Sequence, residues 1–225
     1  MHLLATDRLT CPRCGPEFGL ILLAHQTVGE RRVLEAELGC ANCRDRFPVR
    51  GGFGDLRAPP RGDLPPSRMP SERAPDEAPV SEGVADDAGE GPDPGERYQA
   101  LLNLVQGPGL VAMVGASARW APALADRVED VEVFAVDAGT AAWEERPGVT
   151  RLVAAPGLPI FPGSLRGVVV DGELGHRWIG EAVRVLAPRN RLVVEAAPDG
   201  TAERLEGAGL KVLAEDHGTL VAARD

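Results

Sequence analysis

The chain has 225 residues and a formal net charge of −10, which is too acidic for a protein that binds nucleic acid generally through its phosphates. Its length allows one medium domain and one small domain, and its aromatic content of 4% argues against base stacking as a main function. No apolar run approaches the roughly 18 residues of a membrane span, and no signal-peptide core is present, so we expect a cytoplasmic protein without a membrane partner.

Four cysteines lie in two Cys-x-x-Cys pairs near the N-terminus. Cys11 and Cys14 form the first pair and Cys40 and Cys43 the second, with 25 residues between the pairs. In a reducing compartment this spacing is more typical of a metal site than of disulfides, and four thiolates leave no open position for catalysis. We therefore predict a structural zinc, with a hairpin between the pairs; free buried thiols or iron are the alternatives.

The residues around these cysteines resemble a known family. The segments LTCPRCG and LGCANCRDRFPVRGGFGDL are similar to the small zinc ribbons that include the activator subunit of tRNA and protein methyltransferases. In that family the second cysteine pair precedes YPIxxGIPxL, and FPVRGGFG stands here at residues 47–54. The resemblance covers residues 1–57 and implies a ribbon that stabilises a methyltransferase by lending it a strand edge. A ribbon that serves only as a small fold is the alternative.

Residues 58–96 are rich in proline, glycine and acid. They carry 10 acidic residues against 3 arginines, so they hold most of the chain's charge imbalance. Such a segment buries too little apolar surface to offset the entropy of ordering it. We predict an acidic disordered linker, long enough for the ribbon to dock on the domain that follows.

From residue 97 onwards, apolar strands alternate with helices. We expect helices at 98–106, 176–186 and 202–207, with a further helix after a small-residue turn at 115–118. The predicted strands are 110–114, 131–136, 150–154, 167–171 and 191–196, followed by an antiparallel pair at 210–214 and 218–223. This alternation predicts a doubly wound, Rossmann-like α/β sheet.

The first strand–turn–helix unit of this region has the pattern of a nucleotide site. Gly115 opens the turn after the first strand, where a backbone can approach a ligand closely. Asp137 ends the next strand, 22 residues later, which is close to the spacing expected for an acid that binds a ribose hydroxyl.

The same region resembles class I S-adenosylmethionine-dependent methyltransferases, nearest the ubiquinone/menaquinone C-methyltransferase-like branch. LPIFPGSLRGVVV at 158–170 matches LPFpdgsFDvV, and EAVRVLAPRNRLVV at 181–194 matches EaxRVLkPGGrlvv. The resemblance covers nearly all of residues 97–225 and implies a methyltransferase sheet behind the small zinc ribbon. It places Gly115, Ser117, Asp137 and Asp171 at the cofactor, and it assigns no catalytic residue.

The departures from that family fall at the cofactor contacts. The family loop reads (D/E)-x-G-x-G-x-G, but here Met113 replaces the acid, and Ser117 and Arg119 replace two glycines. The acid that would contact adenine has become Ala155 or Pro156. Losing a charge-assisted contact costs about 1.5–3 kcal/mol, so these changes predict weak binding of S-adenosylmethionine.

Three functions follow. The leading hypothesis is a ribbon–methyltransferase fusion with a degenerate pocket, which acts as a binding, scaffolding or methyltransferase-activating protein. Its partner would be a methyltransferase or that enzyme's substrate protein, unless the ribbon docks within the chain. The second hypothesis is an active S-adenosylmethionine-dependent methyltransferase stabilised in cis. The third is a zinc-ribbon nucleic-acid binder, with RNA as a possible partner, that contacts phosphate through five ribbon arginines: Arg31, Arg32, Arg44, Arg46 and Arg50.

Overall fold

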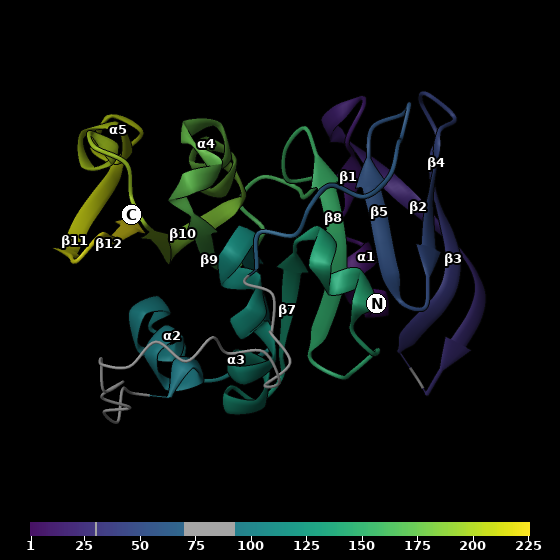
Figure 1. Ribbon diagram of the computed structural model, residues 1–225, viewed down its shortest axis with the longest axis horizontal. Coiled ribbons are helices and arrows are strands. Elements are labelled where there is room, and N and C mark those ends of the chain that lie inside the picture. Colours follow the sequence, from purple (N-terminus) through teal and green to yellow (C-terminus); the bar gives the residue numbers. More distant parts are fainter. Residues whose placement is uncertain (30, 70–92) are drawn as a thin grey trace, which may run out of the picture.

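The computed structural model describes residues 1–29, 31–69 and 93–225, and their strands form one mixed sheet of twelve strands (Figure 1). The N-terminal ribbon builds one half of this sheet and the residues from 109 onwards build the other half.

The C-terminal half is a doubly wound α/β sheet, as predicted. Its parallel strands lie in the order β8 (Val149–Ala155), β7 (Val131–Val136), β6 (Gly109–Val114), β9 (Leu165–Asp171) and β10 (Leu186–Glu195). An antiparallel pair follows, with β12 (Thr219–Arg224) next to β10 and β11 (Leu210–Asp216) at the outer edge. The winding reverses between β6 and β9, where open α/β sheets bind ligands beyond the carboxyl ends of their strands.

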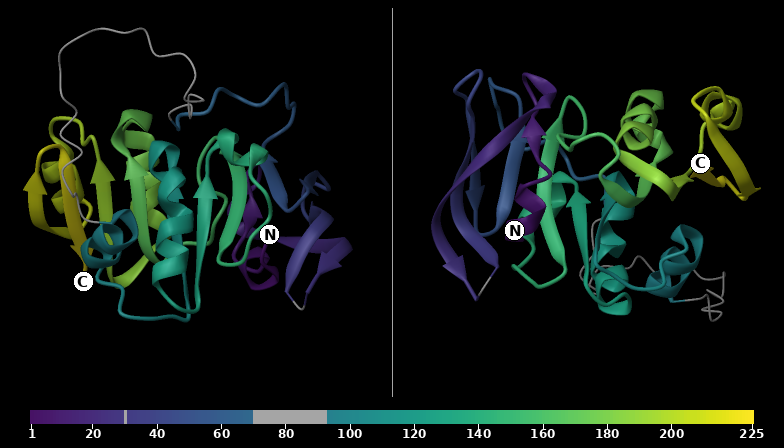
Figure 2. Two further views of the ribbon diagram at one scale, coloured as in Figure 1. Left: turned by 60° about the horizontal axis from the view of Figure 1, so that its bottom comes forward. Right: turned by 180° about the vertical axis from the view of Figure 1, so that it is seen from behind.

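Helices cover both faces of this half. The helices α2 (Pro94–Leu102) and α3 (Ala121–Arg127) pack on one face, and α4 (His176–Val185) and α5 (Thr201–Gly207) pack on the other (Figure 2). None of the described helices combines the length and the apolar character needed to cross a membrane.

The helix predicted at 98–106 begins and ends earlier than expected. Asp93 caps its start by accepting a hydrogen bond from the Glu96 amide at 2.9 Å, and Pro94 occupies the first turn, where its missing N–H costs nothing. Asn103 ends the helix in the left-handed conformation, with φ at 55°. The apolar pattern located the helix, but its caps determine the bounds.

The ribbon is an antiparallel array that starts with the short helix α1 (Leu3–Thr6). Its strands are β1 (Thr10–Cys11), β2 (Gly15–Val28), β3 (Arg32–Cys40), β4 (Arg46–Arg50) and β5 (Phe53–Arg57). The last of these, β5, pairs in parallel with β8, from Phe53 opposite Arg151 to Arg57 opposite Ala155. The ribbon therefore extends the α/β sheet at its β8 edge.

One apolar core runs through this seam. Leu38, Phe47 and Leu56 of the ribbon belong to the same buried cluster as Val114 and Leu152 of the α/β sheet. The connection from β8 to β9, residues 156–164, contains no helix to cover the sheet face beside it. The N-terminal segment lies there instead, and the Thr10 amide donates a hydrogen bond to the Pro159 carbonyl at 2.8 Å.

Ion pairs with little solvent exposure also link the ribbon to the α/β sheet. Glu145 accepts a hydrogen bond from Arg32 of the ribbon at 2.7 Å and pairs with Arg151 of β8 at 3.1 Å. Arg32 also pairs with Glu132 at 2.7 Å, and the exposed fractions of the three side chains that meet at Glu145 do not exceed 12%. Two carboxylates therefore hold Arg32, one of the five arginines named in the third hypothesis.

We expect Glu145→Ala to destabilise the whole chain by about 3–5 kcal/mol, because it leaves the buried Arg151 guanidinium without its carboxylate partner and removes one of the two carboxylates that hold Arg32. The matched control is Glu37→Ala, which breaks the exposed Glu37–Arg46 pair and should cost less than about 1 kcal/mol. Urea unfolding followed by circular dichroism measures both values. Equal losses for the two variants, or separate transitions for ribbon and sheet, would contradict the single-core description.

Candidate nucleotide site and metal centre

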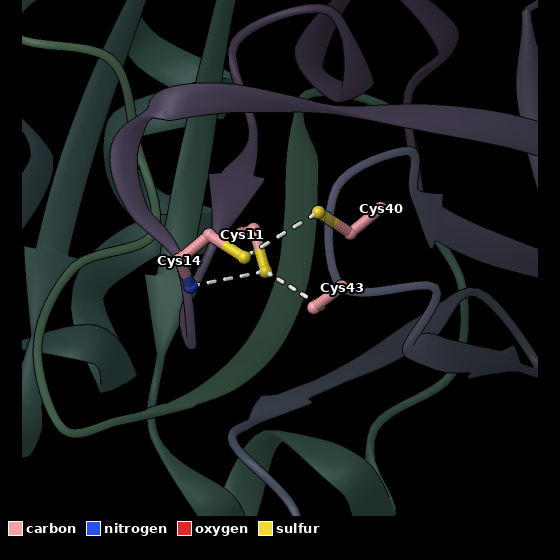
Figure 3. A group of neighbouring side chains, drawn as sticks. All are labelled: Cys11, Cys14, Cys40 and Cys43. Atoms are coloured by element: carbon pink, nitrogen blue, oxygen red, sulfur yellow. Dashed lines mark hydrogen bonds between the residues drawn. The ribbon is translucent and has the colours of Figure 1, made fainter.

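The four cysteines converge from the two knuckles of the ribbon (Figure 3). Their sulfur atoms all lie within 4.8 Å of one another; Cys11 and Cys43 are 3.7 Å apart, and Cys14 and Cys40 are 3.8 Å apart. A tetrahedral ion with metal–sulfur bonds of about 2.3 Å would place its sulfurs about 3.8 Å apart. The cluster therefore has the geometry to hold one metal ion.

Neighbouring polar groups orient these thiols. The Asn42 side-chain amide donates a hydrogen bond to the Cys14 sulfur at 3.3 Å, and the Cys14 backbone amide donates to the Cys11 sulfur at 3.4 Å. Arg13 on the first knuckle pairs with Asp45 beyond the second knuckle at 3.0 Å. These contacts hold the two knuckles together. Burial raises the pKa of the Cys43 thiol to about 12.

Gly115 has the backbone role expected of a nucleotide loop. Its φ is +74°, and a Cβ at this position would lie 2.9 Å from Asp171 Cβ and 2.9 Å from Leu174 Cδ1. Only glycine fits at this left-handed, crowded position. The turn continues as the 3-10 helix η1 (Gly115–Trp120), which precedes α3. Gly115 is thus fixed by packing within the protein, whether or not a ligand binds.

The three loop residues that differ from the family pattern, Met113, Ser117 and Arg119, lie in different surroundings. Met113, at the position where the family resemblance expects an acid, is fully buried and packs into the core on the α2–α3 face. Ser117 is buried beneath the loop, with 4% of its surface exposed. The Arg119 guanidinium lies over the Trp120 ring, 4.9 Å from its centre.

Asp171 holds the loop from below. One carboxylate oxygen accepts a hydrogen bond from the Ala116 amide at 3.3 Å, and the other accepts from the Glu173 amide at 3.0 Å. The side chain is buried and caps the 3-10 helix η3 (Gly172–Leu174). Asp171 therefore lies next to Gly115, and both of its carboxylate oxygens bind backbone amides.

Asp137 is at the tip of β7 and is bound by residues from the predicted linker. Its Oδ1 accepts a hydrogen bond from the Ser67 hydroxyl at 2.7 Å, and its Oδ2 accepts from the Arg68 amide at 3.1 Å. Oδ1 also accepts from the Gly139 amide at 2.8 Å, which caps the 3-10 helix η2 (Ala138–Ala142). These partners could not be predicted from the sequence, because Ser67 lies in a proline-rich stretch without apolar periodicity.

The cavity beside the loop is small and acidic. It measures 230 Å³ and lies between Ala116, Trp120 and the strand ends that carry Asp171 and Glu195. A larger cavity of 750 Å³ lies at the amino ends of the parallel strands, where Gly109 and Gly148 line it. The smaller of these two cavities lies at the carboxyl edge of β9 and β10, where sheets of this class bind ligands.

Tyr98 of α2 also lines the small cavity and is 3% exposed. Burial, aided by the nearby Glu195 carboxylate, raises the pKa of Tyr98 to about 12. The phenol therefore stays neutral throughout the physiological pH range.

Because Tyr98 is the chain's single tyrosine, tyrosinate absorbance should titrate one group with a midpoint near pH 12 in the folded protein. In urea the midpoint should fall to about 10. A raised acid pKa favours the neutral folded form, so this contribution to stability is complete below pH 10 and declines between about pH 10 and 12. A folded-state midpoint near pH 10 would place Tyr98 in solvent instead.

No protein-family model and no curated protein matches this chain. Among solved structures, it is similar to the [4+2]-cyclase SpnF, with 18% identity and a TM-score of 0.42 over 53% of this chain and 57% of that one. It is also similar to precorrin-6y C5,15-methyltransferase from Geobacter metallireducens, with 18% identity and a TM-score of 0.42 over 58% and 87% of the two chains. A predicted O-methyltransferase from Agrobacterium tumefaciens has 19% identity and a TM-score of 0.40 over 59% and 83%.

Proposed function

We propose that this chain is a methyltransferase-like binding or scaffolding protein whose S-adenosylmethionine pocket has degenerated. The observation that carries the proposal is the 230 Å³ cavity at the loop, which is smaller than the roughly 300–1,000 Å³ of ordinary small-molecule sites. The side chains of Ser117 and Arg119 stand where the related loop has glycines. The loop therefore leaves too little room for a full sulfonium nucleoside.

The charges in the cavity support the same proposal. Asp171, Glu173 and Glu195 line it together with Arg119, so a methionine carboxylate would face three acidic side chains and one arginine. Arg97 already pairs with Glu195 at 2.8 Å, and Arg119 stacks on Trp120. Met113 stands where the family resemblance expects an acid that orients the methionine end, and its side chain packs into the core.

The ribbon supports a stabilising role within the chain. Its strand β5 is already paired with β8, so the strand edge that the family resemblance assigns to a partner is used internally here. Ile21 and Leu23 on β2 are 65% and 56% exposed, which leaves an apolar face for a protein partner. We propose that the partner, a methyltransferase or its substrate protein, contacts surfaces other than the β5 edge.

We also propose that the cysteine cluster holds zinc. Zinc prefers tetrahedral thiolate sites, and four cysteines complete its coordination without an open position. The ion would be structural: Cys11 and Cys40 are buried in the core that joins ribbon and sheet, so metal binding is coupled to the folding of both.

Metal analysis of the purified chain should find one zinc per molecule, and cobalt substitution should give the absorption of a tetrahedral tetrathiolate site. Cys40→Ser should abolish stoichiometric binding and lower the thermal midpoint, because a ligand is lost inside the shared core. Asn42→Ala is the control, since it removes only a hydrogen bond to the Cys14 sulfur and should keep the metal. Bound iron, or Cys40→Ser protein that retains its zinc, would contradict the assignment.

Calorimetric titration tests the degenerate pocket. We expect the wild-type chain to bind S-adenosylmethionine and S-adenosylhomocysteine no more tightly than about the millimolar range. Ser117→Gly combined with Arg119→Gly should strengthen binding, because it restores the room that the loop lacks. A micromolar dissociation constant for the wild type would reject degeneracy and favour an active methyltransferase that binds its cofactor through Gly115, Asp137 and Asp171.

A further inference from the structure

The direction of β5 brings the next segment of the chain to the ligand edge of the sheet. Because β5 runs parallel to β8, both strands end at the edge where β7 and β6 also end. The Ala58 amide continues the pairing with a hydrogen bond to the Ala155 carbonyl at 3.1 Å. Residues 58–69 then cross from β5 towards the tip of β7 (Figure 1).

Two arginines fix the start of this path. Arg57 binds Asp55 and also donates hydrogen bonds to the carbonyls of Gly62 at 3.0 Å and Asp63 at 2.7 Å. Arg61 donates to the carbonyls of Arg57 at 2.8 Å and Arg46 at 3.0 Å, and its guanidinium lies over the Phe47 ring. Residues 57–63 therefore form a defined bend against the ribbon, and the segment leaves it in a fixed direction.

The far end of the segment fills the Asp137 subsite. Ser67 and Arg68 supply one hydroxyl and one amide donor, which engage the two oxygens of the Asp137 carboxylate separately. A ribose would present its two neighbouring hydroxyls to the same pair of oxygens. The segment thus provides the same number of donors, at hydrogen-bond distance, as the sugar would.

Close approach at Gly139 completes the fit. A Cβ on Gly139 would lie 2.7 Å from Met69 Cε and 2.8 Å from Ser67 Cβ, so the segment can lie here only because residue 139 has no side chain. Met69 is partly buried and packs against the core on the α2–α3 face. Residues 67–69 therefore contact the sheet at Asp137 and Gly139 through both hydrogen bonds and apolar packing.

We propose that the nucleoside subsite of this sheet is the docking site of residues 67–69 and that this docking excludes nucleosides. The proposal deepens the proposed function, since it concerns the ribose end of the same pocket, whereas the degeneracy concerns the loop around Ser117 and Arg119. Asp137 is retained as the anchor of the chain's own segment.

Amide exchange measured by NMR on the full chain tests the docking directly. The Arg68 amide should exchange at least about tenfold more slowly than in an unstructured peptide, because a carboxylate accepts its proton. Asp137→Ala should remove this protection, and Gly139→Ala should do so through the added methyl group. Arg68→Ala, which keeps the backbone donor, should retain the protection. Equal exchange in wild type and Asp137→Ala would overturn the docking.

Adenosine binding tests the exclusion. Adenosine lacks the methionine half, so its affinity does not depend on the loop at residues 117–119. Ser67→Ala combined with Arg68→Pro removes both hydrogen bonds that the segment donates to Asp137. This variant should bind adenosine at least about tenfold more tightly than wild type or Arg68→Ala. The gain should disappear when Asp137→Asn is added. Equal adenosine affinity in the opened variant and wild type would overturn the exclusion.

S-adenosylmethionine added to the same opened variant separates the two proposals. If it binds no more tightly than adenosine, the methionine end is degenerate and the proposed function stands beside the docking. If it binds far more tightly than adenosine, the docked segment alone blocks a competent pocket. The degenerate-pocket function would then fail while the docking would hold.

Discussion

The parallel pairing of β5 with β8 is the constraint on which the rest of the structure depends. It joins the small ribbon that carries the cysteine cluster and the doubly wound domain into one sheet with one apolar core. It also sets the direction in which the chain leaves the ribbon. An antiparallel β5 would have delivered residues 58–69 to the opposite edge, far from Asp137. The position of Ser67 on Asp137 is therefore a consequence of strand direction.

The apolar contacts and the ion pairs between the ribbon and the α/β sheet respond differently to the loss of a side chain. Apolar contacts such as Leu56 on the sheet face tolerate small adjustments, whereas the Arg32–Glu145–Arg151 group requires all of its members, because a buried charge without a partner is costly. A metal at the cysteine cluster would act on the same core, since Cys11 and Cys40 are buried within it. The ribbon's stability and that of the α/β sheet are linked through these shared residues.

The candidate cofactor residues have structural duties that explain their presence without a ligand. Gly115 satisfies a left-handed turn against Asp171, and Asp171 caps two backbone turns. Asp137 caps η2 and binds the segment at residues 67–69. Residues that match a cofactor motif can thus be retained for conformational reasons, and for this reason the proposed function rests on the space and charge around them.

The sequence by itself determined the alternation of strands and helices, the strand-tip positions of Gly115, Asp137 and Asp171, and the grouping of four cysteines that could hold a metal. These features depend on local periodicity and spacing, which the chain carries in short stretches. Only the tertiary structure decided that β5 joins β8, that Arg32 pairs with Glu132 and Glu145, and that Ser67 reaches Asp137. Each of these contacts joins residues about 70 or more positions apart in the sequence. A local sequence pattern cannot predict such contacts, because they depend on the order and direction of the strands in the sheet.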